Sequence, residues 1–273
     1  MKFPRRSLLG MLILAPAVRL ILSSLGLAAL ASWLWLRVET LAQPSQPSYR
    51  RGARVQLPMP ELSGVIALEQ ALASRRSIRE YRSEPITLRE LGQLLWSAYG
   101  ITETRWGFKT MPSAGATYPL EIYAVVRDVE GLEPGAYRYL PHSHELEQTR
   151  AGELNQELYG AALEQEWVLN AQLNLVITAV YSRTTRRYGE RGVRYVFMEA
   201  GHACQNVYLQ ATALGLGAVA IGAFNDDEVA RIVGAGEEEH TIYMIAVGRP
   251  VKQYRITLEE ISSYYAARRL TSS

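Results

Sequence analysis

The segment from Gly192 to Leu214 constrains the fold of this chain more than any other. Its spacing predicts one long helix, and apolar residues recur around the whole circumference of that helix. They are Val193, Val196, Phe197, Met198, Ala200, Ala203, Cys204, Val207, Leu209, Ala211 and Leu214. A helix that is apolar all round must be buried on every side. The segment is therefore either the central helix of the domain or part of an interface between two chains.

The N-terminal part, residues 1–42, has the composition of a membrane or export segment. Lys2, Arg5 and Arg6 precede an apolar stretch, and residues 20–36 within it carry no charge. At ~1.5 Å per residue these span roughly 25 Å, close to the ~30 Å hydrocarbon core of a bilayer. A membrane anchor and a cleaved export signal both stay open. The basic run also resembles a twin-arginine signal, whose pathway carries folded proteins. Either way, we expect the folded domain outside the cytoplasm.

Residues 43–61 are rich in proline and serine without apolar periodicity, which predicts a linker. The folded domain is expected over residues 62–273. Inside it, the patterns predict alternating helices and strands without a strict βαβ rhythm, so the fold class is α+β or mixed α/β. The expected helices cover residues 65–73, 87–100, 154–171, 192–214 and 226–232, and the expected strands 121–127, 135–140, 173–181, 218–222 and 241–247.

Charge and cysteine content exclude several classes of protein. The formal charge is +2, and the arginines are spread along the chain without a nucleic-acid-binding signature. The single cysteine, Cys204, excludes an intrachain disulfide and a zinc site built from paired cysteines. We interpret His142 and His144 as a solvent-facing pair and His202 as a hydrogen-bonded core histidine, so no metal site is predicted.

Three segments have the residue types that bind a flat, phosphorylated ligand. The run Arg75-Arg76-Ser77-Ile78-Arg79 supplies guanidinium groups and a hydroxyl for a phosphate, although a solvated basic helix end would look similar. The small residues of segment 112–119 allow close approach to a ligand. Segment 214–224 is rich in glycine but does not match a dinucleotide-binding fingerprint.

In this order, these segments resemble the nitroreductase superfamily. The nearest branch is the SagB-type dehydrogenases, which include thiazoline and oxazoline oxidases of peptide natural-product pathways. The resemblance covers roughly residues 62–250, and its marks are Arg-Arg-Ser-Ile-Arg-Glu-Tyr at 75–81, Pro-Ser-Ala-Gly-Ala-Thr-Tyr-Pro at 112–119, Tyr-Gly-Glu-Arg-Gly-Val-Arg-Tyr at 188–195 and Glu-Ala-Gly-His-Ala-Cys-Gln-Asn at 199–206.

The resemblance implies a nitroreductase-like α+β fold, with a central mixed or antiparallel sheet flanked by helices. It also implies a non-covalent FMN at a homodimer interface. The residues that match the family's cofactor-binding positions are Arg75, Arg76, Ser77 and Arg79 for the phosphate and ribityl chain, Ser113, Ala114 and Gly115 beside the isoalloxazine, Gly222 and Ala223 with their backbone toward the flavin, and Arg249 near the phosphate.

The expected activity is hydride transfer through flavin N5. The favoured reaction is reduction of a small acceptor, such as a nitroaromatic or a quinone, with NAD(P)H as donor. A dehydrogenase that oxidises azolines in a modified peptide is one alternative, and a flavin-binding protein without turnover is another. The azoline-oxidising branch typically has a catalytic Lys-Tyr pair, where this chain has Arg187-Tyr188. Because arginine keeps its proton, it cannot act as a base, so we expect azoline oxidation to be slow or absent.

Overall fold

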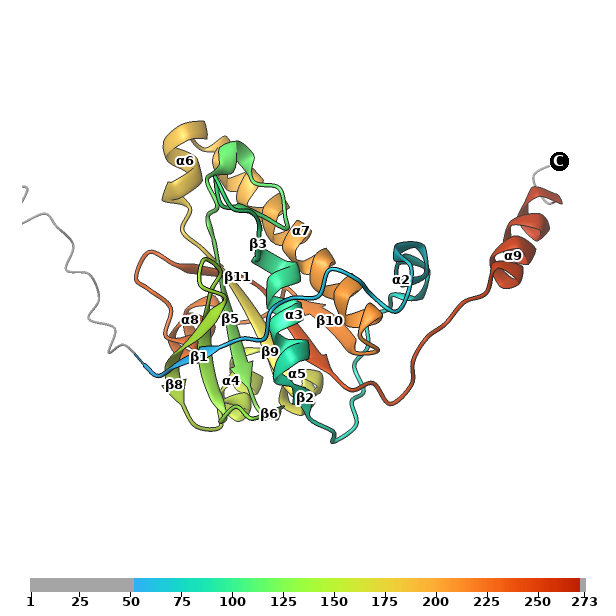
Figure 1. Cartoon of the computed structure of the whole chain (residues 1–273), viewed down its shortest axis with the longest axis horizontal. Helices are drawn as coiled ribbons and strands as arrows, with labels where there is room; N and C mark the ends of the chain where they lie inside the picture. The colour runs from blue at the N-terminus through green and yellow to red at the C-terminus, as the bar shows by residue number, and fades with distance from the viewer. Residues whose placement is uncertain (1–51, 271–273) are drawn as a thin grey trace, which may run out of the picture. The chain divides into compact units, whose positions relative to one another are not determined.

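The structure is a computed structural model of the chain, and it describes residues 52–270 (Figure 1). The predicted membrane or export segment, residues 1–42, lies outside the described residues. Within residues 52–270, no helix is both long and apolar enough to cross a bilayer.

The centre of the described domain is a seven-stranded sheet in which every pair of neighbours is antiparallel. The sheet is thus antiparallel, within the expected mixed or antiparallel class. Its strands, in spatial order, are β1 (Arg54–Gln56), β8 (Glu145–Ala151), β7 (Gly135–Leu140), β5 (Leu120–Val126), β9 (Leu173–Ala179), β11 (His240–Gly248) and β10 (Gly217–Ile221). The predicted hairpin of residues 121–127 and 135–140 is confirmed as β5 and β7.

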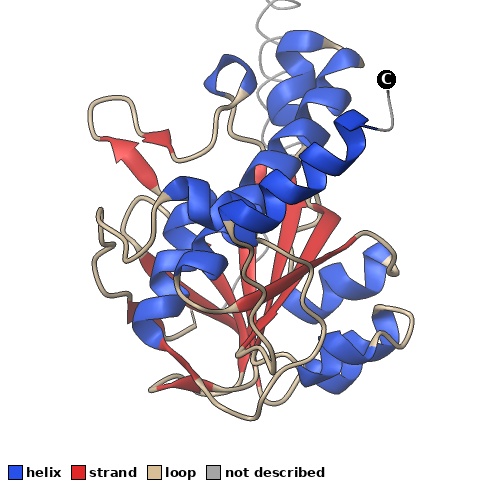
Figure 2. Cartoon of the chain, turned by 90° about the vertical axis from the view of Figure 1, so that its right-hand side faces the viewer, coloured by secondary structure: helices blue, strands red, loops and turns tan. Residues whose placement is uncertain are grey.

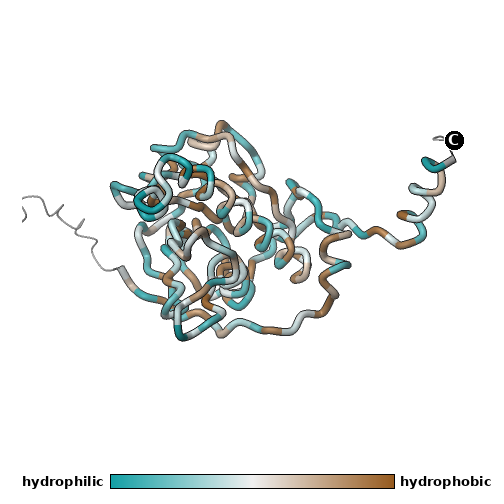
Figure 3. The backbone as a smooth tube through the Cα atoms, turned by 90° about the horizontal axis from the view of Figure 1, so that it is seen from above, coloured by the Kyte–Doolittle hydropathy of each residue, from teal (hydrophilic) through white to brown (hydrophobic). Residues whose placement is uncertain are grey.

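Helices cover both faces of this sheet (Figure 2). On one face α3 (Leu88–Tyr99) and α7 (Arg191–Ala213) enclose one apolar core, and on the other face α4 (Asn155–Ala161), α5 (Glu166–Asn170) and α8 (Asp226–Val233) enclose a second. Hydrophobic and hydrophilic segments alternate along the chain in Figure 3, as expected for elements that bury only one side. The inner strand β9 is buried at every position because both of its faces are covered.

The remaining elements are short or peripheral. They are α2 (Leu68–Ser74), β2 (Ile86–Thr87), β3 (Ile101–Glu103), β4 (Phe108–Lys109), the single-turn η1 (Ala114–Ala116), β6 (Val129–Glu130), α6 (Ser182–Tyr188) and α9 (Leu258–Leu270).

Helix α7 is buried on one side only. Val196, Ala203 and Val207 are fully buried between the sheet and α3, whereas Phe197 and Met198 are 52% and 51% exposed. The apolar pattern predicted either a central helix or a helix at an interface between two chains. Burial within one chain accounts for one face of α7. On the other face, large apolar side chains are uncovered.

Some local predictions hold and others need correction. Thr87 and Glu90 form the predicted capping box of α3, because each side chain accepts the other residue's backbone N–H. The predicted linker 43–61 contains β1, whose backbone pairs with β8, so the sheet begins before Leu62. Polar composition concealed this edge strand, since an edge strand needs little apolar surface.

Two histidine predictions also change. His202 is exposed rather than in the core, because it lies on the uncovered side of α7. Each ring nitrogen of His144 has a partner, the Tyr139 hydroxyl at 2.9 Å and the Pro58 carbonyl at 2.9 Å, so it is half-buried rather than solvent-facing. Asn225 caps α8 by accepting the Glu228 N–H.

Candidate active site

The arginine-rich run 75–79 follows α2 as an extended strip beside the edge strand β10. Ser77 bridges to Ala218, and the Ile78 N–H donates to the Ala218 carbonyl at 2.9 Å. Side chains of an extended strip alternate in direction. The Ile78 side chain packs directly over Gly217, where a Cβ would come within 2.7 Å of it. The glycine therefore allows the strip to lie against the sheet.

Tyr208 of α7 connects this strip to β10. Its hydroxyl accepts the Ala220 N–H at 2.7 Å and lies 3.1 Å from the Ser77 hydroxyl. The Arg75 guanidinium lies over the Tyr208 ring, 5.1 Å from its centroid. Sequence reasoning missed Tyr208, because it read this helix only for apolar positions. Arg75, Ser77 and Tyr208 thus form one connected group of polar side chains.

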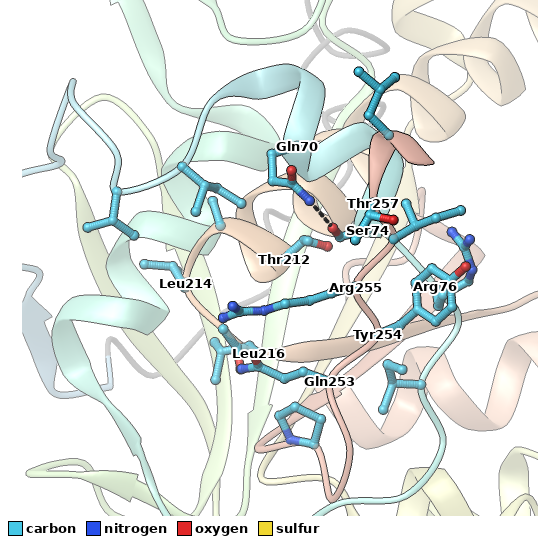
Figure 4. A pocket seen from close by; sticks show the side chains of 18 residues that line it. Gln70, Ser74, Arg76, Thr212, Leu214, Leu216, Gln253, Tyr254, Arg255 and Thr257 are labelled. Atoms are coloured by element: carbon cyan, nitrogen blue, oxygen red, sulfur yellow. Dashed lines mark hydrogen bonds between the residues drawn. The ribbon is translucent and has the colours of Figure 1, made fainter. Parts of the chain in front are cut away.

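Arg76 has different neighbours from Arg75. Its Nη1 donates to the carbonyls of Ala73 and Arg75, and its guanidinium stacks on the Tyr254 ring at 3.7 Å. Figure 4 shows this pair at one end of a cavity of about 660 Å³ that also adjoins the end of α7. The predicted cofactor-binding arginines therefore do not all face the same space.

A basic cavity of about 480 Å³ adjoins the strip. Arg76, Ser77 and Arg79 line it together with Lys252, a residue that the sequence analysis did not select. The Arg79 guanidinium also lies 5.3 Å from the centroid of the Trp167 ring. The hydroxyl and cationic groups here are the chemistry that a phosphate requires.

Gly222 and Ala223 follow β10 and are exposed. A Cβ added to Gly222 would meet nothing within 4 Å, so its backbone is open to a ligand. The Ala223 carbonyl accepts the Gln165 side-chain N–H at 2.8 Å. The arginine-rich strip and Tyr208 contact the same strand, since Ser77 bridges to Ala218 and Tyr208 binds Ala220 of β10. The open backbone at residues 222–223 therefore continues the strand that the strip contacts. We call residues 75–79, Tyr208 and residues 222–223 the clamp.

The predicted loop Ser113–Gly115 is held by the buried Glu199 of α7. The Glu199 carboxylate accepts the Ala114 N–H at 2.8 Å, and the Ser113 hydroxyl accepts the Tyr118 N–H at 2.9 Å. Burial raises the pKa of the Glu199 carboxyl, and hydrogen bonds from Ala114 and Ser113 oppose that rise. Its second oxygen is buried without a hydrogen-bond partner in the described part of the chain.

Arg187 and Tyr188, at the end of α6, lie against this loop. The Arg187 Nη1 donates to the Gly115 carbonyl at 3.3 Å. Gly115 has φ = +61°, and a Cβ there would lie 2.6 Å from the Tyr188 hydroxyl. Glycine is therefore required twice, by backbone conformation and by space. We call residues 113–115, 187, 188 and 199 the loop group.

The clamp and the loop group lie at different points along helix α7. Glu199 holds the loop group, and Tyr208, nine positions further along α7, contacts the clamp strip. At ~1.5 Å per residue, these two buried positions are roughly 13 Å apart along the helix axis. The structure therefore brings the predicted site residues together in two separate groups.

The comparisons with known proteins identify the family. The model of the nitroreductase family matches residues 72–249, a span that includes the clamp and the loop group. The chain belongs to the nitroreductase family. The predicted resemblance is thus confirmed, and the family makes this protein an oxidoreductase.

Individual nitroreductase relatives agree with this result. The candidate nitroreductase MJ1384 of Methanocaldococcus jannaschii is 50% identical over 201 residues, which are 74% of this chain and all of that protein. A structure described as a candidate nitroreductase from Ralstonia eutropha has a TM-score of 0.64 at 30% identity, covering 75% of this chain and 95% of that one. The microcin B17-processing protein McbC of Escherichia coli is 28% identical over 152 residues, 54% of this chain and 56% of that protein.

Arg249, one of the predicted cofactor-binding residues, forms an ion pair within the fold. Its Nη1 and Nη2 each donate to the Glu90 carboxylate at 2.8 Å, and its Nε donates to the Pro85 carbonyl at 3.1 Å. A phosphate at Arg249 would have to compete with this two-point ion pair. The cavity beside the clamp instead contains Lys252, a late basic residue from the same C-terminal segment.

Proposed function

We propose that this nitroreductase-family protein binds FMN between two copies of the chain, with the clamp from one copy and the loop group from the other. The observation behind this proposal is the separation of the two groups along α7, by roughly 13 Å in a single chain. We infer that a second copy of the chain, packed on the uncovered face of α7, supplies the loop group to the clamp of the first. The uncovered side chains Phe197 and Met198 on α7 supply apolar surface for such a homodimer.

The residues of the clamp fit the phosphate end of FMN. Arg76, Arg79 and the neighbouring Lys252 provide positive charge in the cavity, and Ser77 provides a hydroxyl. Arg75 adds a guanidinium beside Tyr208, and the open backbone at Gly222 allows close approach. FMN, when bound, supplies hydride transfer at N5, and the protein contributes binding and orientation. In the loop group, Gly115 lets a flat ring lie close to the backbone, and Glu199 fixes the loop that carries it.

For the reaction, we propose reduction of a small acceptor with a nicotinamide donor. The residue that separates this from azoline oxidation is Arg187, whose guanidinium binds the Gly115 carbonyl. It can orient an anionic group, but it cannot accept a proton from a substrate carbon. The relationship to McbC, named as a microcin-processing protein, supports oxidation of a peptide azoline as the second candidate. An Arg187→Lys variant tests this point, because azoline oxidation should rise only when a titratable base is present.

The proposed cofactor is tested by purification and one matched pair of variants. The protein should purify yellow, and Arg75→Ala should weaken FMN binding by roughly one to two decades, the loss of one hydrogen bond to a charged group. Arg82→Ala is the matched control, because Arg82 is exposed and pairs with Glu84 outside the clamp. A colourless protein that takes up no added FMN would end this proposal.

The shared site is tested by mixing two inactive variants. Arg75→Ala damages the clamp, and Gly115→Val damages the loop group. In a two-fold dimer, mixed pairs hold one intact site, so co-expression should restore about a quarter of the wild-type activity. If both groups served one flavin within a single chain, no mixture would regain activity.

We also propose that residues 1–42 hold the protein at a membrane or direct its export, with the catalytic domain outside the cytoplasm. The basic flank and the uncharged stretch 20–36 support this. The twin-arginine route would suit a protein that binds its flavin before export.

A further inference from the structure

A cavity of about 470 Å³ lies beside the loop group but is lined by other residues. Its walls come from α3, the β3–β4 hairpin, β5, β7 and α6. Three tyrosines, Tyr99, Tyr118 and Tyr139, give it an aromatic lining, and Trp106, which is 67% exposed, lies at its edge. Such a space suits a flat apolar body more than a flexible polar one.

The charges in this cavity are unbalanced. Lys109, Arg138 and Arg183 line it, with Glu121 as the only lining carboxylate in the described chain. Glu121 is already engaged, because one oxygen binds Arg138 at 2.9 Å and the other binds Arg183 at 2.6 Å. The Arg138 Nε is buried with no hydrogen-bond partner among the described residues.

Lys109 is the cation without a counter-ion. Its Nζ lies 3.7 Å from the centroid of the Tyr99 ring and 5.0 Å from that of Tyr118. Within residues 52–270, this ammonium makes no hydrogen bond or ion pair. Partly buried charges are normally paired, and an aromatic cage compensates only part of the lost hydration.

The choice of lysine at this position is itself informative. The chain has 29 basic residues, and only Lys2, Lys109 and Lys252 are lysines. Arginine supplies a fixed charge, whereas a lysine in such surroundings can release its proton near neutral pH. A chain that uses arginine almost everywhere has here a basic side chain whose charge can be switched.

We propose that this cavity binds an aromatic carboxylate, whose carboxylate pairs with Lys109 and whose ring packs against the tyrosines. The site is separate from the proposed flavin site. Its existence does not depend on FMN, since none of its lining residues belongs to the clamp or the loop group. Tyr118 links it to the loop, because its N–H binds Ser113, so an acid bound here would contact the residue that anchors the loop.

Binding should depend on pH in a direction that the structure sets. Burial lowers the pKa of Lys109 to about 8, a fall opposed by Glu121 and reinforced by Arg183. Only the protonated amine pairs with a carboxylate, so affinity is full below pH 8 and is lost as the pH rises through that value. Burial raises the pKa values of Tyr99 and Tyr139, so these hydroxyls stay neutral over the same range. The charged and titratable groups facing the amine are Tyr99, Tyr118, Glu121, Arg138, Tyr139, His142 and Arg183.

Calorimetric titration of the full-length protein with benzoate, and with benzamide as its neutral counterpart, tests the proposal. Benzoate should bind at least tenfold more tightly than benzamide at pH 7, and roughly tenfold more weakly at pH 9 than at pH 7. Lys109→Met should reduce benzoate affinity by roughly tenfold to hundredfold. Lys109→Arg should keep the affinity but lose its dependence on pH.

The matched control is Arg231→Met, which removes one exposed positive charge on α8, on the other face of the sheet. It should bind benzoate like the wild type, and unchanged thermal unfolding of each variant verifies folding. The proposal is overturned if benzoate does not bind, if benzamide binds equally well, or if Lys109→Met binds benzoate like the wild type. The last result would place the acid elsewhere, for example against a bound flavin.

Discussion

Replacing Arg249 by methionine separates a structural role of this residue from a role in cofactor binding. Arg249 ties the end of β11 to the first turn of α3 through two 2.8 Å hydrogen bonds to Glu90 and one to the Pro85 carbonyl. The side chains of the pair are only 20% and 15% exposed. Methionine keeps the aliphatic volume and removes every donor, so the Glu90 carboxylate loses its counter-ion.

The expected loss of stability follows from this geometry. Breaking a fully buried ion pair costs ~3–5 kcal/mol, because the remaining charge is left unpaired. The partial exposure reduces this figure, and Glu90 keeps its hydrogen bonds from the Thr87 N–H and hydroxyl. We expect the free energy of unfolding to fall by about 2–4 kcal/mol, a fall in Tm on the order of 10 °C for a domain of this size.

Urea and thermal unfolding followed by circular dichroism measure this loss, with FMN affinity measured on the same samples. Glu90→Gln and the double variant complete a cycle, and the coupling energy should be about 1–3 kcal/mol, since the two side chains touch. The reasoning is refuted if Arg249→Met unfolds like the wild type while its FMN affinity drops tenfold or more. That outcome would place Arg249 at the phosphate, as its family position implies.

Three further predictions follow from single features. Gly115→Ala should lower activity at least tenfold, because the new methyl group would contact Tyr188. Gly131 has a similar positive φ but open space around it, so Gly131→Ala should change only the stability, by about 1 kcal/mol. Equal activity losses of the two variants in steady-state assays would contradict this prediction. Burial raises the pKa of Cys204 to about 12, so iodoacetamide at pH 8 should label it only after unfolding, and rapid labelling of the native protein would disprove its burial. In intact spheroplasts, added protease should degrade the catalytic domain; a protected domain would contradict export.

The local elements of this protein follow from its sequence. The capping box at Thr87 and Glu90, the hairpin of β5 and β7 and the length of α7 each depend on residues that are near in the chain. Local steric and hydrogen-bonding rules are sufficient for such elements. The chemistry of segments 75–79 and 112–119 could also be predicted from the sequence. Guanidinium groups and hydroxyls indicate a phosphate, and small residues indicate close approach to a flat ligand, whatever the fold around them. The family, too, could be identified from these motifs.

Only the tertiary structure decided how those motifs are combined. The family resemblance implied one set of cofactor-binding residues, but the fold holds them in two groups at different points along α7, and periodicity along a helix does not reveal which segments pack against it. Arg249 was assigned to the phosphate by its match to a family position, yet its partner Glu90 lies 159 positions away in the chain. The rarity of lysine did not by itself single out Lys109, since its missing counter-ion becomes visible only when α3, β5, β7 and α6 enclose one cavity. Pairing between distant residues is set by chain topology, and for that reason the electrostatics of each site could be read only from the folded structure.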